Sequence, residues 1–267
     1  MAGPTTAERG DRQQESSGPP PGRRLGKLRL PRLRGIVVLA AALVLLVAGV
    51  VWTLYGSKWL RVDHVSVQGT VVLTPEQVRQ AARVPVGEPL ISVDTDAIAA
   101  ALRRKLPRID EVEVVRSWPH GIGLKVTERV PVLLIGKGGR FVEVDKEGVR
   151  FATVSQAPKG VAALKLDPPR SGSATASLRR FGEDRLVREA VDVAGDIPAN
   201  VARETRVVKV RSYDDISLEL SGGRTVEWGS DENGGAKART LNALMKAAPR
   251  AGHFDVSVPT APASSGS

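Results

Sequence analysis

The chain has 267 residues, a length that corresponds to about two domains. Apolar residues make up 42% and charged residues 25%, so most of the chain can bury a core rather than stay disordered. The chain has no cysteine, which excludes disulfide scaffolds, thiol catalysis and cysteine-ligated metal sites. Its three histidines lie far apart in sequence, so we expect no metal or other cofactor unless folding brings two of them together.

Positive charge is concentrated at the amino terminus. Residues 1–34 contain eight Lys or Arg and three Asp or Glu, which gives +5 of the total net charge of +10. Six of these bases lie in residues 23–34, where there is no acid. The preceding stretch is rich in Gly, Pro, Ser and Gln, a composition typical of flexible tails. We predict that residues 1–34 form a basic, disordered cytoplasmic tail.

An uncharged stretch follows directly and predicts a transmembrane helix over residues 35–57. Its apolar part, residues 36–55, would span roughly 30 Å as a helix, the thickness of the hydrocarbon core. A signal peptide would have a shorter apolar part followed by small residues, and a soluble core helix would have a polar face. Bases before the span and aromatic residues at its far end are typical of membrane interfaces. The predicted interface residues are Arg32, Arg34, Trp52, Tyr55 and Trp59.

The flanking charges predict the orientation. Six bases precede the span closely, whereas only Lys58 and Arg61 follow it, so the amino terminus should stay cytoplasmic and the remainder should lie outside the membrane. The basic cluster contains no interleaved aromatic residues, which favours contact with anionic lipid over nucleic-acid binding.

Residues 60–130 predict a small α+β domain. A strand with alternating apolar residues starts near residue 64, and Thr74 with Gln77 forms a capping-box pattern for a helix over residues 75–83. A second helix should begin at Asp94 or Asp96 and end before Pro107, followed by strands at residues 109–116 and 122–128. The expected order is therefore strand, helix, helix, strand, strand.

This order behind a membrane anchor resembles a POTRA domain, and two motifs narrow the resemblance. Residues 116–132, RSWPHGIGLKVTERVPV, are similar to the signature of the bacterial cell division protein family FtsQ, also called DivIB. Residues 139–151, GRFVEVDKEGVRF, resemble the hairpin that follows in that family. The signature positions are Arg116, Trp118, Pro119, Glu128, Arg129 and Pro131.

Residues 131–260 predict a mainly antiparallel β domain with flanking helices. We expect strands at residues 141–144, 149–154, 162–166, 206–211, 216–220, 225–228 and 254–258. Amphipathic helices should cover residues 183–194 and 236–247, and residues 167–177 should form a loop or insertion. Residues 261–267 are expected to form a disordered carboxy-terminal tail.

The last strand is the predicted partner-binding site, because an exposed sheet edge can accept a strand from another chain. The resemblance implies that the FtsB (DivIC) partner adds its strand here. The candidate residues are Phe254, Asp255, Val256, Ser257, Val258, Pro259 and Thr260. Pro259 lacks one ladder donor, and Ser257 and Val258 replace larger residues often found in the family, so the side-chain contacts should differ.

No catalytic motif is present in the sequence. The adjacent or alternating acidic pairs are typical of solvated strands and turns; they are Glu111/Glu113, Asp214/Asp215 and Asp231/Glu232. The resemblance implies a non-enzymatic, single-pass scaffold at the division septum of a GC-rich Gram-positive bacterium. Such a protein links early and late division proteins. It would bind FtsB/DivIC-like and FtsL-like bitopic proteins, act indirectly on the septal synthases FtsW and FtsI, and bind no nucleic acid or small-molecule substrate. The alternatives are a POTRA module of protein transport, which would need a barrel, and a membrane-anchored cell-wall hydrolase.

Overall fold

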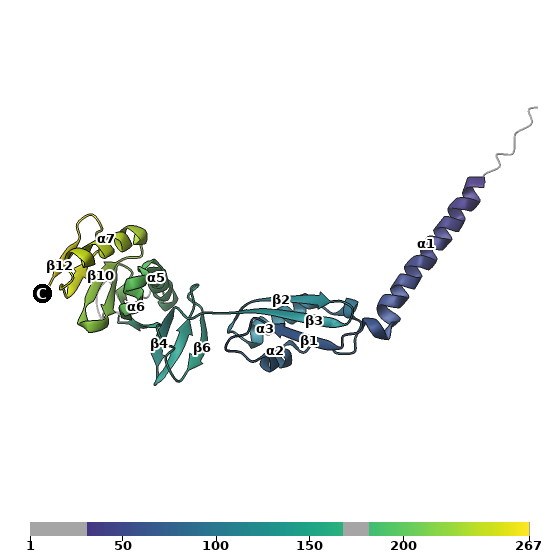
Figure 1. The fold of residues 1–267 in the computed structure, drawn as a ribbon, viewed down its shortest axis with the longest axis horizontal. Coiled ribbons are helices and arrows are strands. Elements are labelled where there is room, and N and C mark those ends of the chain that lie inside the picture. Colours follow the sequence, from purple (N-terminus) through teal and green to yellow (C-terminus); the bar gives the residue numbers. More distant parts are fainter. Residues whose placement is uncertain (1–30, 168–181, 267) are drawn as a thin grey trace, which may run out of the picture. The chain divides into compact units, whose positions relative to one another are not determined.

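The computed structural model describes residues 31–167 and 182–266, and Figure 1 labels many of its helices and strands. The first element is helix α1 (Pro31–Gly56), which starts four residues before the predicted span. Its part Arg34–Gly56 is long and apolar enough to cross a membrane. Most of the large apolar side chains from Ile36 to Tyr55 are exposed, as the side chains of a lipid-facing helix are. Trp52 and Tyr55 lie in its last two turns, and Trp59 lies in the short helix η1 (Lys58–Leu60) that follows.

The segment after η1 folds as a small α+β domain in the predicted order. Strand β1 (His64–Gln68) is followed by α2 (Pro75–Ala82), the short helix η2 (Leu90–Ser92), α3 (Thr95–Lys105), β2 (Ile109–Ser117) and β3 (Gly121–Glu128). The sheet order is β1-β3-β2, with β1 parallel and β2 antiparallel to β3. Thr74 and Gln77 form the capping box that the sequence predicted for α2. Both helices bury apolar side chains against the sheet, including Val78 and Leu102, which are fully buried.

The second domain is built on a nine-stranded mixed sheet of order β12-β11-β10-β9-β8-β7-β4-β5-β6. Five of its strand pairs are antiparallel and three are parallel, which confirms the α+β class and the mainly antiparallel arrangement. Its strands are β4 (Leu133–Lys137), β5 (Arg140–Val144), β6 (Arg150–Val154), β7 (Ala162–Leu166), β8 (Thr205–Ser212), β9 (Asp215–Leu220), β10 (Thr225–Gly229), β11 (His253–Asp255) and β12 (Ala263–Ser265). The short helix η3 (Ser221–Gly223) connects β9 and β10.

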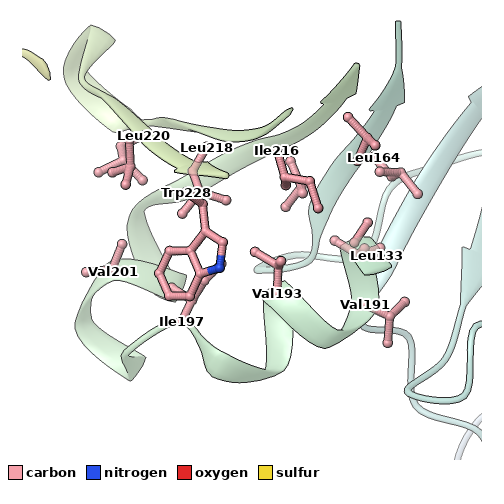
Figure 2. Close-up of a cluster of buried hydrophobic side chains, with 14 of the residues drawn as sticks. Leu133, Leu164, Val191, Val193, Ile197, Val201, Ile216, Leu218, Leu220 and Trp228 are labelled. Atoms are coloured by element: carbon pink, nitrogen blue, oxygen red, sulfur yellow. The ribbon is translucent and has the colours of Figure 1, made fainter. Parts of the chain in front are cut away.

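Helices α5 (Glu183–Asp196), α6 (Ala199–Glu204) and α7 (Gly234–Ala247) accompany this sheet. Helix α5 contacts β7 and β8, and α7 contacts β11. Figure 2 shows the Trp228 indole of β10 beside Ile197 and Val201, which lie at and after the end of α5. Trp228 is fully buried, so its side chain fixes β10 to the apolar core. β10 in turn lies next to the carboxy-terminal edge of the sheet.

Among the described residues of this domain, strands β4 and β12 and helix α6 were not predicted from the sequence. Strand β4 is a continuous apolar run without alternation, and it is recognised only through its pairing with β5 and β7. The predicted loop at residues 167–177 lies outside the described residues apart from Asp167.

Two arginines join the small domain to the sheet domain. Arg108, just before β2, pairs with the buried carboxylate of Glu143 in β5, and its guanidinium carbon lies 5.1 Å from the centroid of the Phe151 ring. Arg129, just after β3, pairs with Asp145, whose side chain is 2% exposed.

The Asp145 carboxylate has a second role in the hairpin between β5 and β6. It accepts hydrogen bonds from the amides of Glu147 and Val149 at 3.0 and 2.8 Å. Arg129 also contacts Asp110 at 3.3 Å and Glu147 at 3.5 Å. One guanidinium therefore neutralises the buried charge that shapes the hairpin turn.

Removing this guanidinium should destabilise the protein strongly. In Arg129→Ala, the buried Asp145 carboxylate loses its counter-charge, and we expect a loss of about 3 kcal/mol or more in unfolding free energy. The measurement is denaturant unfolding of the full chain in detergent micelles, followed by tryptophan fluorescence.

Arg79→Ala is the matched control, because Arg79 forms an exposed pair with Glu76 at 2.8 Å. We expect this control to lose less than about 1 kcal/mol. Equal losses in both variants would contradict the role given to Arg129.

Candidate functional site

The candidate site is the carboxy-terminal edge of the nine-stranded sheet, where β10, α7 and β12 are labelled in Figure 1. Strand β11 lies parallel to β10, with Phe254 opposite Val226. The amide of Val256 donates to the Glu227 carbonyl at 2.9 Å, and the Thr225 amide donates to the Gly252 carbonyl at 2.9 Å. Residues 252 to 256 are therefore fixed to β10 by their backbone.

Two of the predicted partner-binding residues belong to the core. Phe254 and Val256 are fully buried and pack in the same apolar cluster as Trp228. Their side chains hold β11 on the sheet and cannot reach a partner. Because backbone groups alternate along a strand, the amide and carbonyl groups of His253 and Asp255 point to the side opposite β10.

The strand is shorter than the sequence predicted. It ends at Asp255, whose carboxylate accepts hydrogen bonds from the Ser257 amide at 3.0 Å and the Ser257 hydroxyl at 2.7 Å. The prediction of a strand over residues 254–258 is wrong beyond Asp255, because this local turn redirects the chain. Val258 is exposed, and the Pro259 carbonyl accepts a hydrogen bond from the Thr240 hydroxyl of α7 at 3.3 Å. Thr260 follows outside any strand and is exposed.

The chain then returns along the outer side of β11, where we predicted a disordered tail over residues 261–267. Residues Ala263–Ser265 instead form β12, antiparallel to β11, with Ser264 opposite Phe254. The Gly252 amide donates to the carbonyls of Ser265 and Gly266 at 3.2 and 3.0 Å. All three residues of β12 are exposed and carry small side chains, so β12 is held by its backbone rather than by a buried side chain.

Acidic side chains lie on β10 and β11. Hydrogen bonds from Ser257 hold the pKa of the Asp255 carboxyl below its ordinary value. Glu227 lies opposite Asp255 on β10, and burial, with a further contribution from Asp215, raises the pKa of its carboxyl. Arg211 lies 3.8 Å from Glu227 and partly offsets this effect. The edge thus combines outward backbone groups with acidic side chains.

The predicted signature residues organise the small domain and its junction. The Arg116 guanidinium donates to the carbonyls of Val93 at 2.6 Å and Leu90 at 3.2 Å. Glu128 accepts hydrogen bonds from three successive amides in the loop before α2, with donor–acceptor distances of 2.7 to 3.1 Å; the donors are Val71, Val72 and Leu73. These two charged residues satisfy backbone groups that would otherwise lack partners.

The remaining signature residues lie in connections. Trp118 and Pro119 form the turn between β2 and β3, where the peptide bond between them is cis. Trp118 is 49% exposed, and Pro131 lies between Arg129 and β4. The signature therefore maps to contacts that shape the small domain and its link to the sheet domain, apart from the exposed Trp118.

Two acidic residues of the pairs weighed in the sequence have polar partners outside their own pair. Glu113 pairs with Lys125 at 3.0 Å on the exposed face of the small sheet, and Asp214 accepts a hydrogen bond from the Ser212 hydroxyl at 2.6 Å. The structure instead brings Asp231 close to the buried Glu189 of α5, a pair that sequence spacing did not suggest. Burial and, next, the Asp231 carboxylate raise the pKa of Glu189, while Arg185 lies 3.4 Å away.

This pair predicts a pH-dependent stability. The folded state favours protonated Glu189, so this group contributes stability below the ordinary carboxyl pKa and loses it as the pH rises through the raised value. Glu189→Gln should therefore raise the unfolding midpoint at about pH 7 and have a smaller effect at about pH 4. Chemical denaturation at both pH values measures this.

Glu219→Gln is the control for this prediction, because Glu219 is an exposed glutamate on β9. Its effect should be the same at both pH values. A Glu189→Gln effect that does not depend on pH would contradict the assignment.

Two of the three histidines, which lie far apart in sequence, come together in the small domain. The ring centroids of His64 and His120 are 5.4 Å apart. Asp63 lies beside them, and within the described parts of the chain these three form the group of side chains that could hold a metal ion.

Comparison with known proteins agrees with this architecture. Residues 60–129 match the family model described as the FtsQ-type POTRA domain. The chain is 74% identical over 267 residues to the cell division protein FtsQ of Streptomyces coelicolor and 73% identical to that of Streptomyces collinus, with 100% of each chain covered. It is 32% identical over 232 residues to the FtsQ protein of Mycolicibacterium smegmatis, a match that covers 86% of this chain and 65% of that one. With a candidate membrane-spanning helix, a POTRA domain and a large mixed sheet, the chain belongs to the FtsQ (DivIB) family of bacterial cell division proteins, in its actinobacterial branch.

Proposed function

We propose that this protein is a non-enzymatic, single-pass scaffold of the bacterial divisome, with a cytoplasmic amino terminus and its two folded domains outside the membrane at the septum. The charge asymmetry around α1 supports the orientation, because bases concentrate before the span. In this arrangement the POTRA domain and the sheet domain together present binding surfaces to other division proteins, and α1 restricts them to the membrane.

The partner-binding site in this proposal is the outer side of β11. The single observation that carries it is the composition of the strand that covers this side: β12 has three residues, all exposed. Such a short edge strand gains little from side-chain burial, and its hydrogen bonds can be replaced by those of a longer strand. A strand of an FtsB/DivIC-like protein would take the place of β12 on β11. The FtsL-like protein would bind as part of that complex, and the septal synthases would be contacted indirectly through it.

Two buried residues, one in β11 and one directly after it, explain why this edge can exchange strands without unfolding. Phe254 and Val256 anchor β11 in the core, while His253 and Asp255 direct their backbone groups outward. Replacing β12 therefore leaves the bonds between β10 and β11 in place. The partner strand would be recognised mainly by its backbone.

Two changes at this edge should alter partner affinity in opposite directions. A chain ending at residue 261 lacks β12, so the partner no longer displaces it, and we expect about tenfold tighter binding. Asp255→Pro removes an outward amide donor and should weaken binding about tenfold or more. The measurement is titration of the full-length protein in lipid nanodiscs with a purified FtsB/DivIC-like protein of the same bacterium.

Val258→Pro is the matched control, because Val258 is exposed and lies after β11. Its affinity should equal that of the unchanged protein. Circular dichroism establishes that each variant is folded. Unchanged affinity in both the truncated chain and a folded Asp255→Pro variant would rule out the β11 edge as the site.

The proposed orientation makes a separate prediction. Trypsin added to intact cells whose outer layers are permeable to it should digest the part of the chain after residue 57, where Lys58 and Arg61 provide cleavage sites. An epitope placed before residue 34 should survive. Protection of the carboxy-terminal domains in intact cells, together with their digestion after lysis, would reverse the proposed orientation.

A further inference from the structure

Asp63, His64 and His120 form a cluster in the POTRA domain that the scaffold role does not use. Each of the three side chains offers one ligand atom, and these atoms all lie within 4.8 Å of one another. We propose that this cluster binds one divalent transition-metal ion of the zinc type through two imidazole nitrogens and one carboxylate oxygen.

The backbone brings the three ligands together. Asp63 lies directly before β1 and His64 is its first residue, whereas His120 lies in the turn directly before β3. The Asp63 amide donates to the His120 carbonyl at 2.9 Å, and His64 is paired with Gly121 in the parallel ladder between β1 and β3. The ligands therefore come from two segments that the sheet already fixes side by side, so binding does not have to order the backbone first.

The side chains are also available to a metal. Asp63 and His64 are exposed and His120 is half-buried. Within residues 31–167 and 182–266, no protein group forms a hydrogen bond with any of these three side chains. Ligand atoms around tetrahedral zinc lie roughly 3.3 Å apart, so rotation of the exposed side chains is enough to close the site.

Gly121 provides space for one of the imidazoles. A Cβ atom at this position would lie 2.7 Å from Nε2 and 2.9 Å from Cε1 of His64. The absent side chain thus allows the His64 ring to lie across the neighbouring strand, toward His120. Any larger residue would displace the ring.

The surroundings select the class of metal. Lys58 and Arg61 line the same pocket as Asp63 and His120, and the Arg61 guanidinium donates to the Gly87 carbonyl at 2.8 Å. Calcium and magnesium need several oxygen ligands, and one carboxylate beside two cations does not supply them. Neutral imidazoles bind zinc, nickel and copper, and three protein ligands leave a coordination position for water. A bound ion would clamp the start of β1, eight residues after the end of α1, to the turn between β2 and β3.

Calorimetric titration of the full chain with ZnCl₂ tests this proposal, with the protein in detergent micelles and purified through a tag without histidine. The unchanged protein should bind one Zn²⁺ ion. His64→Gln and His120→Gln should each weaken binding about tenfold or more, because each removes one ligand. His253→Gln is the matched control, since His253 is the third histidine of the chain and lies on β11, and it should bind Zn²⁺ unchanged.

A thermal measurement gives a second result that needs no variant. Zn²⁺ should raise the unfolding temperature of the unchanged protein, whereas Ca²⁺ at the same concentration should not. The proposal is overturned if the unchanged protein binds Zn²⁺ no more tightly than the His64→Gln/His120→Gln double variant, if His253→Gln loses as much affinity as the other two, or if Zn²⁺ leaves the unfolding temperature unchanged.

Discussion

Backbone amide and carbonyl groups at the edge of a sheet need hydrogen-bonding partners, and this requirement governs the carboxy-terminal end of the protein. β11 meets it on one side through β10 and on the other through the three exposed residues of β12. The first contact is anchored by buried Phe254 and Val256, whereas the second has no comparable anchor. The edge is therefore stably positioned and weakly covered, which is the combination that strand exchange requires.

The other end of the sheet domain is held by charge. Arg108 and Arg129 flank β2 and β3 of the POTRA domain and pair with buried carboxylates of the β5–β6 hairpin. Arg129 follows directly after Glu128, whose carboxylate holds the loop before α2. Two neighbouring signature residues thus have separate tasks: one shapes the POTRA domain and the other joins it to the sheet domain. This gives a physical reason for their adjacency in the motif.

Much of the fold could be predicted from local patterns. The capping box at Thr74, the alternation in β1 to β3 and the hairpin around Asp145 depend on nearby residues, and the structure contains all of them. β4 escaped prediction because its apolar residues do not alternate with polar ones, and β12 escaped it because its residues are small and mostly polar. The sequence assigned the candidate partner-binding residues to the last strand, part of which the structure contains as β11. It could not distinguish the buried anchors, Phe254 and Val256, from residues beyond the turn at Ser257. The pairing of Glu189 with Asp231 and of His64 with His120 likewise depends on tertiary structure.

The central claim is that a partner strand replaces β12 on β11. Amide hydrogen exchange of the full-length protein in nanodiscs, with and without an FtsB/DivIC-like protein, tests it most directly. We predict that the partner slows exchange at Asp255 and accelerates it at Ala263 and Ser265, because the partner's strand takes over the hydrogen bonds that β12 made. Saturating partner that leaves the exchange of β12 unchanged would show that binding occurs elsewhere and would contradict the claim.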